Sequence, residues 1–287
     1  MSLDLEISII WTLSLSVLAY VSGRQLNAAR RGVGSILFVA SLLGTLVFAW
    51  RFSGRLHWTE SLPGARVVFW SSLMPIILCF TAGLARRTRC MSQRARVVTM
   101  LGLAGLAAAY TLMPVVRPIM APIELSAQTR WSGGICLQSH SSSCAPAAAV
   151  TLLRMSGVVA DERELAQACL TSQHGTEPVW LFRGLKRHAT EPYASVRVAS
   201  DEPDRWGDQG QLPNISLIQF QCSDAALSFL MGARGEGHAV VVFGRDSGGN
   251  WIIGDPAFGR TTWSDDQFRS RFTGDAIFLA QTKTRFE

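Results

Sequence analysis

Lysine is absent from the first 121 residues of this 287-residue chain, and acidic residues are scarce there. The same segment holds twelve arginines and three acids, so it carries a net charge of +9, whereas residues 122–287 carry −3. The arginines lie in short loops between apolar runs and do not gather on one folded face. The basic isoelectric point therefore does not indicate nucleic-acid binding, and we expect no nucleic-acid partner.

Two kinds of binding motif are also missing. No pair of cysteines has the CxxC spacing that is typical of zinc sites. No Walker-type Gly-x-x-x-x-Gly-Lys-Ser/Thr sequence occurs, so the chain does not carry a recognisable nucleotide-binding loop. We expect neither a cofactor nor a bound metal ion.

Long apolar runs are abundant in the first half of the chain. Four of them approach the roughly 20 residues that cross a bilayer, at about 7–22, 34–50, 67–85 and 97–116. A cleaved secretory signal is the alternative for the first run, but it lacks a preceding basic region and a clear cleavage site. We predict an all-α region with four transmembrane helices over residues 1–121, a linker over 122–133 and a globular domain over 134–287.

The distribution of arginine predicts how this region is oriented, because positively charged short loops stay in the cytoplasm. The first and third loops between the apolar runs hold eight arginines, whereas the second loop holds three, namely Arg51, Arg55 and Arg66. The segment ahead of the first run holds only Asp4 and Glu6. We therefore expect the N-terminus and the globular domain to lie outside the cytoplasm, provided that the number of spans is even.

The globular half changes from helical to extended patterns along the chain. Helical spacing comes first, over 144–155, 161–170 and 179–188. A late helix is predicted over 264–272, with Ser264 as its N-cap. The sequence between contains short apolar or alternating runs bounded by turn residues, at 195–198, 215–220, 239–243, 251–254 and 276–280. Helices followed by an antiparallel sheet predict an α+β domain.

Cys144 stands at the start of the first of these helices, in Gln138-x5-Cys144-Ala-Pro-Ala-Ala-Ala-Val. A thiol is a good nucleophile only as a thiolate, which a helix N-terminus and a nearby imidazolium both favour. Attack on an acyl carbon creates an oxyanion that needs preorganised donors. The backbone N–H of Cys144 and the side-chain amide of Gln138 are candidates for these donors.

His238 and Asp255 complete a candidate catalytic set. His238 begins one apolar strand and Asp255 ends the next, and a turn at 246–250 makes these two ends neighbours. Asp255 would then fix the tautomer of the imidazole, as the third member of a triad does. His140 is a second candidate base because it is close to Cys144 in sequence, although no evident carboxylate orients it.

These sequences together resemble the papain-like, bacteriocin-processing cysteine peptidases, which remove double-glycine leaders. The resemblance covers residues 136–280, and the motifs that carry it are Gln138-x5-Cys144-x-Pro146, a Gly-Thr-x-x-x-x-Leu segment at 175–181, Gly-His238-Ala-Val-Val-Val, Gly254-Asp255-Pro256-x-x-Gly259 and a closing Ser-x-x-x-Phe helix. It implies a nucleophile at Cys144, a general base at His238, an orienting acid at Asp255 and an oxyanion donor at Gln138. It also implies a peptide substrate, cleavage after small residues such as Gly-Gly, and a location in the bacterial cytoplasmic membrane.

The chain departs from this family in two respects. Ala145 follows the cysteine where the family usually has glycine, and the membrane region precedes the domain. A membrane-tethered peptide-binding module without turnover and a thiol acyltransferase therefore remain alternatives. The partners that we expect are a peptide or protein substrate, the lipid bilayer and, as a further option, another integral membrane protein.

The remaining cysteines and the tryptophans of the globular half have structural interpretations. In an oxidising compartment two of the three residues Cys136, Cys169 and Cys222 can form a disulfide. Cys169 and Cys222 fit equally well as small buried residues. We expect core positions for the tryptophans of this half that lie in helical or strand patterns, namely Trp180, Trp251 and Trp263.

Overall fold

The computed structural model describes residues 3–29, 34–52, 56, 73–86, 88, 91–189, 195–220 and 237–281. The chain forms two compact units, Met1–Val116 and Arg117–Glu287. Cys222 and the first part of the third predicted span, residues 67–72, lie outside the described residues.

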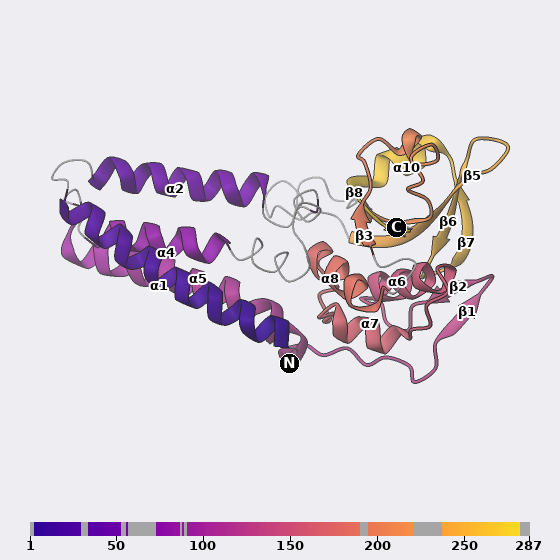
Figure 1. Cartoon of the computed structure of the whole chain (residues 1–287), viewed down its shortest axis with the longest axis horizontal. Coiled ribbons are helices and arrows are strands. Elements are labelled where there is room, and N and C mark those ends of the chain that lie inside the picture. The colour runs from indigo at the N-terminus through magenta and orange to yellow at the C-terminus, as the bar shows by residue number, and fades with distance from the viewer. Residues whose placement is uncertain are drawn as a thin grey trace, which may run out of the picture. The chain divides into compact units, whose positions relative to one another are not determined.

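The first unit contains apolar helices that coincide with the four predicted runs (Figure 1). Helices α1 and α2 both pack against α4, and residues of α5 join the same apolar cluster. Two helices, α1 and α5, are long and apolar enough to cross a membrane, whereas α2 and α4 are shorter. The bounds are Leu3–Ala29 for α1, Gly34–Arg51 for α2, Leu73–Ala85 for α4 and Gln93–Met120 for α5.

Helix α1 buries three of its hydroxyl side chains and exposes many of its large apolar side chains. Ser8, Thr12 and Ser16 follow one another at intervals of four residues and are all buried. This is the reverse of a helix in a soluble protein and matches the packing of helices in lipid, where small and hydroxyl residues face other helices. The exposed large apolar side chains of α1 include Ile7, Ile10, Trp11, Val17 and Leu18.

Two glycines allow α1 and α4 to cross closely. A Cβ atom at Gly23 would collide with the backbone oxygen of Phe80, and one at Gly83 would collide with that of Tyr20. The absence of a side chain at both positions therefore lets the two backbones touch. A hydrogen bond of 2.6 Å between the hydroxyls of Ser41 and Thr81 connects α2 to α4.

The second unit has the predicted α+β fold. Its described part contains a β1–β2 hairpin, helices α6 to α8, and a six-stranded antiparallel sheet in the order β3-β8-β4-β5-β6-β7. The hairpin strands are Arg130–Ser132 and Ile135–Leu137, and the helices are Cys144–Met155 (α6), Glu162–Ala168 (α7), Pro178–His188 (α8) and Asp265–Arg271 (α10). The sheet strands are Ser195–Val198 (β3), Asn214–Gln219 (β4), Gly237–Arg245 (β5), Trp251–Asp255 (β6), Gly259–Trp263 (β7) and Phe272–Ala280 (β8).

The helices cover the sheet from both sides. In Figure 1, α6, α7 and α8 lie on one side of the sheet and α10 lies on the other. Helix α6 packs against β4 and β5, and its residues Ala147 to Ala149 are fully buried. Because alanine adds little bulk, α6 lies close to the strands, and its first residue is held near the start of β5.

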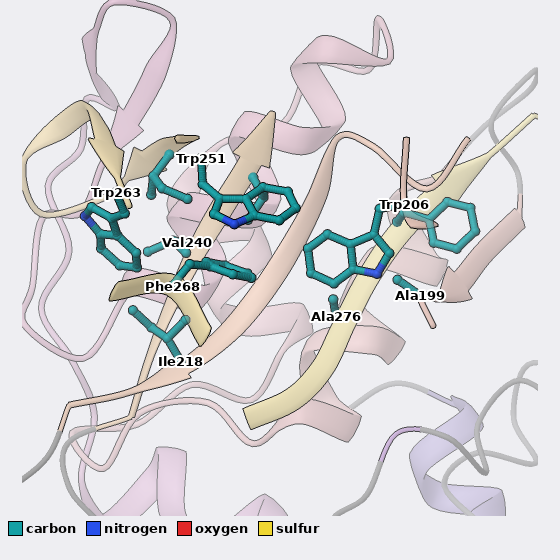
Figure 2. Packing of buried hydrophobic residues seen from close by; sticks show 11 residues of the cluster. Ala199, Trp206, Ile218, Val240, Trp251, Trp263, Phe268 and Ala276 are labelled. Atoms are coloured by element: carbon teal, nitrogen blue, oxygen red, sulfur yellow. The ribbon is translucent and has the colours of Figure 1, made fainter. Parts of the chain in front are cut away.

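Aromatic residues fill the core on the α10 side of the sheet. Figure 2 shows Trp206, Trp251 and Phe268 among the buried side chains of this cluster. The rings of Trp206 and Trp251 meet edge to face with 5.8 Å between centroids, and Trp251 lies 4.9 Å from Phe268. Trp180, Trp251 and Trp263 are all buried, which confirms the core positions predicted for them.

Strand β7 and the cap of α6 differ from the sequence-based expectation. The β7 sequence Gly-Arg-Thr-Thr-Trp lacks apolar alternation, so no pattern predicted that strand. Ser143 is the N-cap of α6 but makes no side-chain capping bond. Its hydroxyl instead donates to the carbonyl of His140 and accepts from the N–H of His140, which closes a tight turn ahead of Cys144.

The segment predicted as a linker lies on the second unit. The carbonyls of Ala121 and Pro122 accept hydrogen bonds from the backbone and side-chain amides of Gln173. Further along, the backbone N–H of Ser126 donates to the hydroxyl of Ser139. Residues 122–133 are therefore attached to the domain that they precede, and their last part includes strand β1.

Two of the domain cysteines are small buried residues. Cys136 and Cys169 are free thiols with no exposed surface, so they do not form a disulfide with each other. Burial raises the pKa of Cys136 to about 12, with a further contribution from the nearby charge of Glu162. Burial likewise raises the pKa of Cys169 to about 12 against a lowering effect of Arg183. Both thiols are therefore poor nucleophiles.

Candidate active site

Cys144 is the first residue of α6, as the sequence predicted, and its side chain is half-buried. The first N–H groups of a helix have no partner within the helix, so they point toward the region in front of it. The next residue but one, Pro146, has no N–H to offer. The backbone N–H groups of Cys144 and Ala145 are therefore the donors that the start of this helix can present to a developing negative charge.

Strands β5 and β6 bring His238 and Asp255 together. Val241 pairs with Gly254 and Val242 with Ile253, so the start of β5 adjoins the end of β6. The Nε2 atom of His238 lies 2.8 Å from Oδ1 of Asp255, and both side chains are largely shielded, with exposed fractions of 11% and 3%. The same carboxylate oxygen accepts the backbone N–H of Ala257 at 2.8 Å, which fixes its orientation.

The pKa of His238 is raised to about 9 by its polar partners. Burial alone would lower this pKa, but the hydrogen bond to Asp255, the hydrogen bond to Cys144 and the charges of both groups outweigh the burial. Because Nε2 is bonded to Asp255, Nδ1 is the nitrogen left to face the thiol. The ring is consequently an imidazolium at neutral pH and lies between a sulfur and a carboxylate.

Gln138 is attached to the turn that carries the acid. Its backbone N–H donates to the carbonyl of Pro256 at 2.8 Å. Its side-chain Nε2 donates one proton to the carbonyl of Ser141 at 3.3 Å, which leaves the second amide proton for another acceptor. The Oε1 atom is buried and has no hydrogen-bond partner within the described part of the chain.

His140, the second candidate base, is occupied in its own loop. Its Nδ1 atom accepts the backbone N–H of Ser142 at 3.1 Å, and its backbone groups bond to Ser143. Among the described residues no ion pair joins His140 to a carboxylate. The carboxylate partner is therefore found at His238 and not at His140.

Two residues near the site were not singled out by sequence reasoning. The ring of Phe220, at the end of β4, lies 5.9 Å from the ring of His238. Glu162, the first residue of α7, is buried and accepts the backbone N–H of Ser139 at 2.9 Å. Both residues come from elements distant in sequence, and no local motif marks them. No group of three His, Cys, Asp or Glu side chains in the described residues is arranged to hold a metal ion.

The match to a known family defines the class of this protein. Residues 133–284 match the Peptidase C39 family. The domain is a cysteine-type peptidase of papain-like α+β fold, and the chain belongs to the Peptidase C39 family. The predicted resemblance to double-glycine leader peptidases is confirmed at the level of this family.

Three solved structures are similar to about half of this chain, and each of them is covered almost completely. A double glycine motif protease from an AMS/PCAT transporter, in complex with its leader peptide, is 19% identical, with 56% of this chain and 99% of that chain covered and a TM-score of 0.42. The peptidase domain of Streptococcus ComA, a bifunctional ABC transporter, is 23% identical, with 51% and 96% covered and a TM-score of 0.39. The Streptococcus mutans ComA domain is 24% identical, with 51% and 98% covered and a TM-score of 0.37. No curated protein matches the chain.

Proposed function

We propose that this chain is a membrane-anchored cysteine peptidase that hydrolyses a peptide bond through Cys144, His238 and Asp255. The observation that carries the proposal is the arrangement around the His238 ring. Its Nε2 atom lies 2.8 Å from Asp255, and Cys144 is close enough to the ring to contribute to its raised pKa. A thiol, an imidazole and a carboxylate in this order are the groups that acyl transfer through a cysteine requires.

In the first half of the reaction the thiolate of Cys144 attacks the carbonyl carbon of the substrate. A C–S bond forms, and the carbonyl electron pair moves to oxygen. The backbone N–H of Cys144 and the free amide proton of Gln138 stabilise this oxyanion. His238 then donates its Nδ1 proton to the leaving nitrogen as the C–N bond breaks, which releases the amine product and leaves a thioester.

Water completes the reaction. Neutral His238 removes a proton from a water molecule, the hydroxide attacks the thioester, and the C–S bond breaks after a second oxyanion has formed. The carboxylic acid product leaves, and the thiolate and imidazolium are restored. Asp255 keeps the ring in the required orientation and stabilises its positive charge throughout.

Ala145 is compatible with turnover. It stands where the resemblance expects glycine, and its side chain is buried, with 5% of the residue exposed. The added methyl group therefore lies against protein and leaves the half-exposed Cys144 beside it accessible. Cleavage after small residues such as Gly-Gly is part of the proposal because of the family to which the domain belongs.

We further propose that the first unit anchors this peptidase in the bacterial cytoplasmic membrane. Support comes from the two spanning-length helices α1 and α5 and from the inward hydroxyls and outward apolar side chains of α1. The arginine-rich loops support an orientation in which the peptidase domain lies outside the cytoplasm. Alkaline phosphatase fused after residue 287 is expected to be active in cells, whereas green fluorescent protein fused there stays dark; the opposite result contradicts the proposed orientation.

Cleavage by the full-length chain in detergent tests the activity. The substrate is a fluorogenic peptide that ends in Gly-Gly-aminomethylcoumarin, and the comparison is with Cys144→Ala. We expect release of the fluorophore and of a free Gly-Gly carboxylate by the wild type only. Binding without cleavage by both proteins would instead indicate a peptide-binding module, and transfer of the acyl group to an added amine without any free acid would indicate an acyltransferase.

A further inference from the structure

The two backbone amides on either side of the Gln138 Cα atom are both held by hydrogen bonds. The N–H of Gln138 donates to the carbonyl of Pro256 at 2.8 Å. The next N–H along the chain, that of Ser139, donates to Oε1 of Glu162 at 2.9 Å. Because φ and ψ of a residue are set by the peptide planes on its two sides, these bonds fix the direction in which the Gln138 side chain leaves the backbone.

The Gln138 side chain depends on this backbone support. Its one hydrogen bond in the described structure is the long contact of 3.3 Å to the carbonyl of Ser141, and its buried Oε1 atom has no partner there. A single contact beyond the usual hydrogen-bond range orients an amide weakly. The position of the side-chain amide is therefore determined chiefly by the two peptide planes.

Glu162 is well suited to hold one of these planes. It is 2% exposed, and a buried carboxylate is retained only where hydrogen bonds compensate for its lost hydration. It lies on the first turn of α7, whose start is fixed by a reciprocal capping box between Asp161 and Glu164. A charged acceptor on a fixed helix makes a stronger and more rigid bond to an N–H than a neutral acceptor does.

Other contacts of the 138–143 loop act elsewhere. The hydroxyl of Ser139 accepts from the N–H of Ser126, and the hydroxyl of Ser142 donates to the carbonyl of Gln173 at 2.7 Å. The first of these bonds holds the Ser139 side chain, and the second holds Ser142, near the end of the loop that leads into α6. The plane that joins Gln138 to Ser139 is held at its N–H by Glu162 at 2.9 Å, and its carbonyl accepts only a longer, exposed contact of 3.4 Å from the guanidinium of Arg130.

We propose that Glu162 is a positioning residue for the oxyanion donor: by holding the Ser139 N–H it aims the Gln138 amide at the oxyanion formed on Cys144. This inference rests on the proposed function, in which Gln138 donates to that oxyanion. Loss of the Glu162 acceptor leaves this peptide plane with only the long contact to Arg130, so the plane can turn and displace the amide. Displacement of a preorganised donor slows the formation of the tetrahedral intermediate without altering the thiolate and imidazolium pair.

Two rates measured on the full-length chain in detergent separate these effects. The first is cleavage of the Gly-Gly-aminomethylcoumarin peptide, which passes through an oxyanion. The second is alkylation of Cys144 by iodoacetamide, which needs the thiolate but forms no oxyanion. We expect Glu162→Ala to lower kcat by about tenfold to a hundredfold and to leave the alkylation rate within about twofold of the wild type.

Matched variants control for the fold of α7. Glu162→Gln keeps an Oε1 acceptor, so this variant is expected to retain most of the wild-type cleavage rate. Glu164→Ala removes a capping contact of the same helix without touching the 138–143 loop, so cleavage is expected to stay within about twofold of the wild type. In the Gln138→Ala background, Glu162→Ala is expected to lower kcat no further, because the group that it positions is already absent.

Three results would overturn the inference while leaving the peptidase proposal intact. The first is unchanged kcat in Glu162→Ala, and the second is an equal loss of cleavage and alkylation in that variant. The third is an additive loss in the double variant. Failure of the peptidase proposal has a different signature, because Cys144 of the wild type would then react with iodoacetamide no faster than Cys136 or Cys169.

Discussion

His238 and Asp255 are seventeen residues apart in sequence, yet their side chains meet at 2.8 Å. The contact depends on the pairing of β5 with β6, and Gly254 is one of the residues in that pairing. A Cβ atom at Gly254 would approach Cδ1 of Ile135 to 2.6 Å and Cε2 of Phe243 to 2.8 Å. A side chain at the residue before the acid therefore requires Ile135 and Phe243 to shift.

Gly254→Ala is expected to destabilise the fold and to disturb the catalytic pair. Relief of the two collisions requires the side chains of Ile135 and Phe243, or strand β6, to move, and overpacking of this kind costs about 1–3 kcal/mol. The measurement is the thermal unfolding midpoint of the full chain in detergent. Gly207→Ala is the matched control, because a Cβ there meets nothing within 4 Å; equal effects of the two substitutions would contradict the packing argument.

The raised pKa of His238 predicts a pH dependence of stability. The folded-state pKa is about 9 and the ordinary value is 6.5. Protonation therefore favours the folded state, so this stabilisation is complete below about pH 6.5 and is lost as the pH rises through about 9. The free energy of unfolding is expected to fall by roughly 3 kcal/mol across this range.

Asp255→Asn tests the origin of this pH dependence. The substitution removes the negative charge beside the ring, so the pKa of His238 falls and the pH slope of stability between about 6.5 and 9 becomes shallower. Thermal unfolding of the wild type and the variant over a pH series provides the comparison. Identical slopes in the two proteins would show that another group titrates.

Cys144→Ala is expected to abolish cleavage of the Gly-Gly peptide and to preserve the fold. The side chain is half-buried at a helix start, so loss of its sulfur removes little packing. The free energy of unfolding of the variant, measured by thermal unfolding, is expected to lie within about 1 kcal/mol of the wild-type value. Residual cleavage at the wild-type rate would exclude Cys144 as the nucleophile.

The close crossing of α1 and α4 gives a prediction for the first unit. Gly83→Leu places a side chain where the backbone of Tyr20 lies and is expected to separate the two helices, lowering the unfolding temperature in detergent. Gly102→Leu on α5 is the control, since a Cβ there meets nothing within 4 Å. A greater loss in Gly102→Leu than in Gly83→Leu would contradict this packing.

Local patterns predicted the regular elements well and the long-range contacts less well. Helix α6 has the bounds, residues 144–155, that its helical spacing predicted. The β5–β6 hairpin also follows from its sequence, because Asp246 accepts the backbone N–H groups of Gly248 and Asn250 in the turn. Because a short turn makes the two strands pair, the start of β5 lies next to the end of β6. The contact between His238 and Asp255 could therefore be inferred from the sequence.

The support of Gln138 could not be inferred in the same way. Glu162 looks like an ordinary acidic residue in the first turn of a helix, and its burial arises only when α7 packs against α6 and the 138–143 loop. The attachment of residues 121–126 to Gln173 and Ser139 is equally invisible in the sequence, because proline and polar residues there resemble a free linker. Contacts of this kind depend on tertiary packing and not on spacing.

Selective alkylation of Cys144 is the most direct test of the central claim, which is that His238 activates this thiol. The full-length chain is treated with iodoacetamide at neutral pH, and the labelled residues are identified by mass spectrometry of peptides. We predict that Cys144 reacts much faster than Cys136 and Cys169, whose pKa values are about 12, and that His238→Ala removes this advantage. Equal labelling of the three cysteines in the wild type, or unchanged labelling of Cys144 in His238→Ala, would contradict the account.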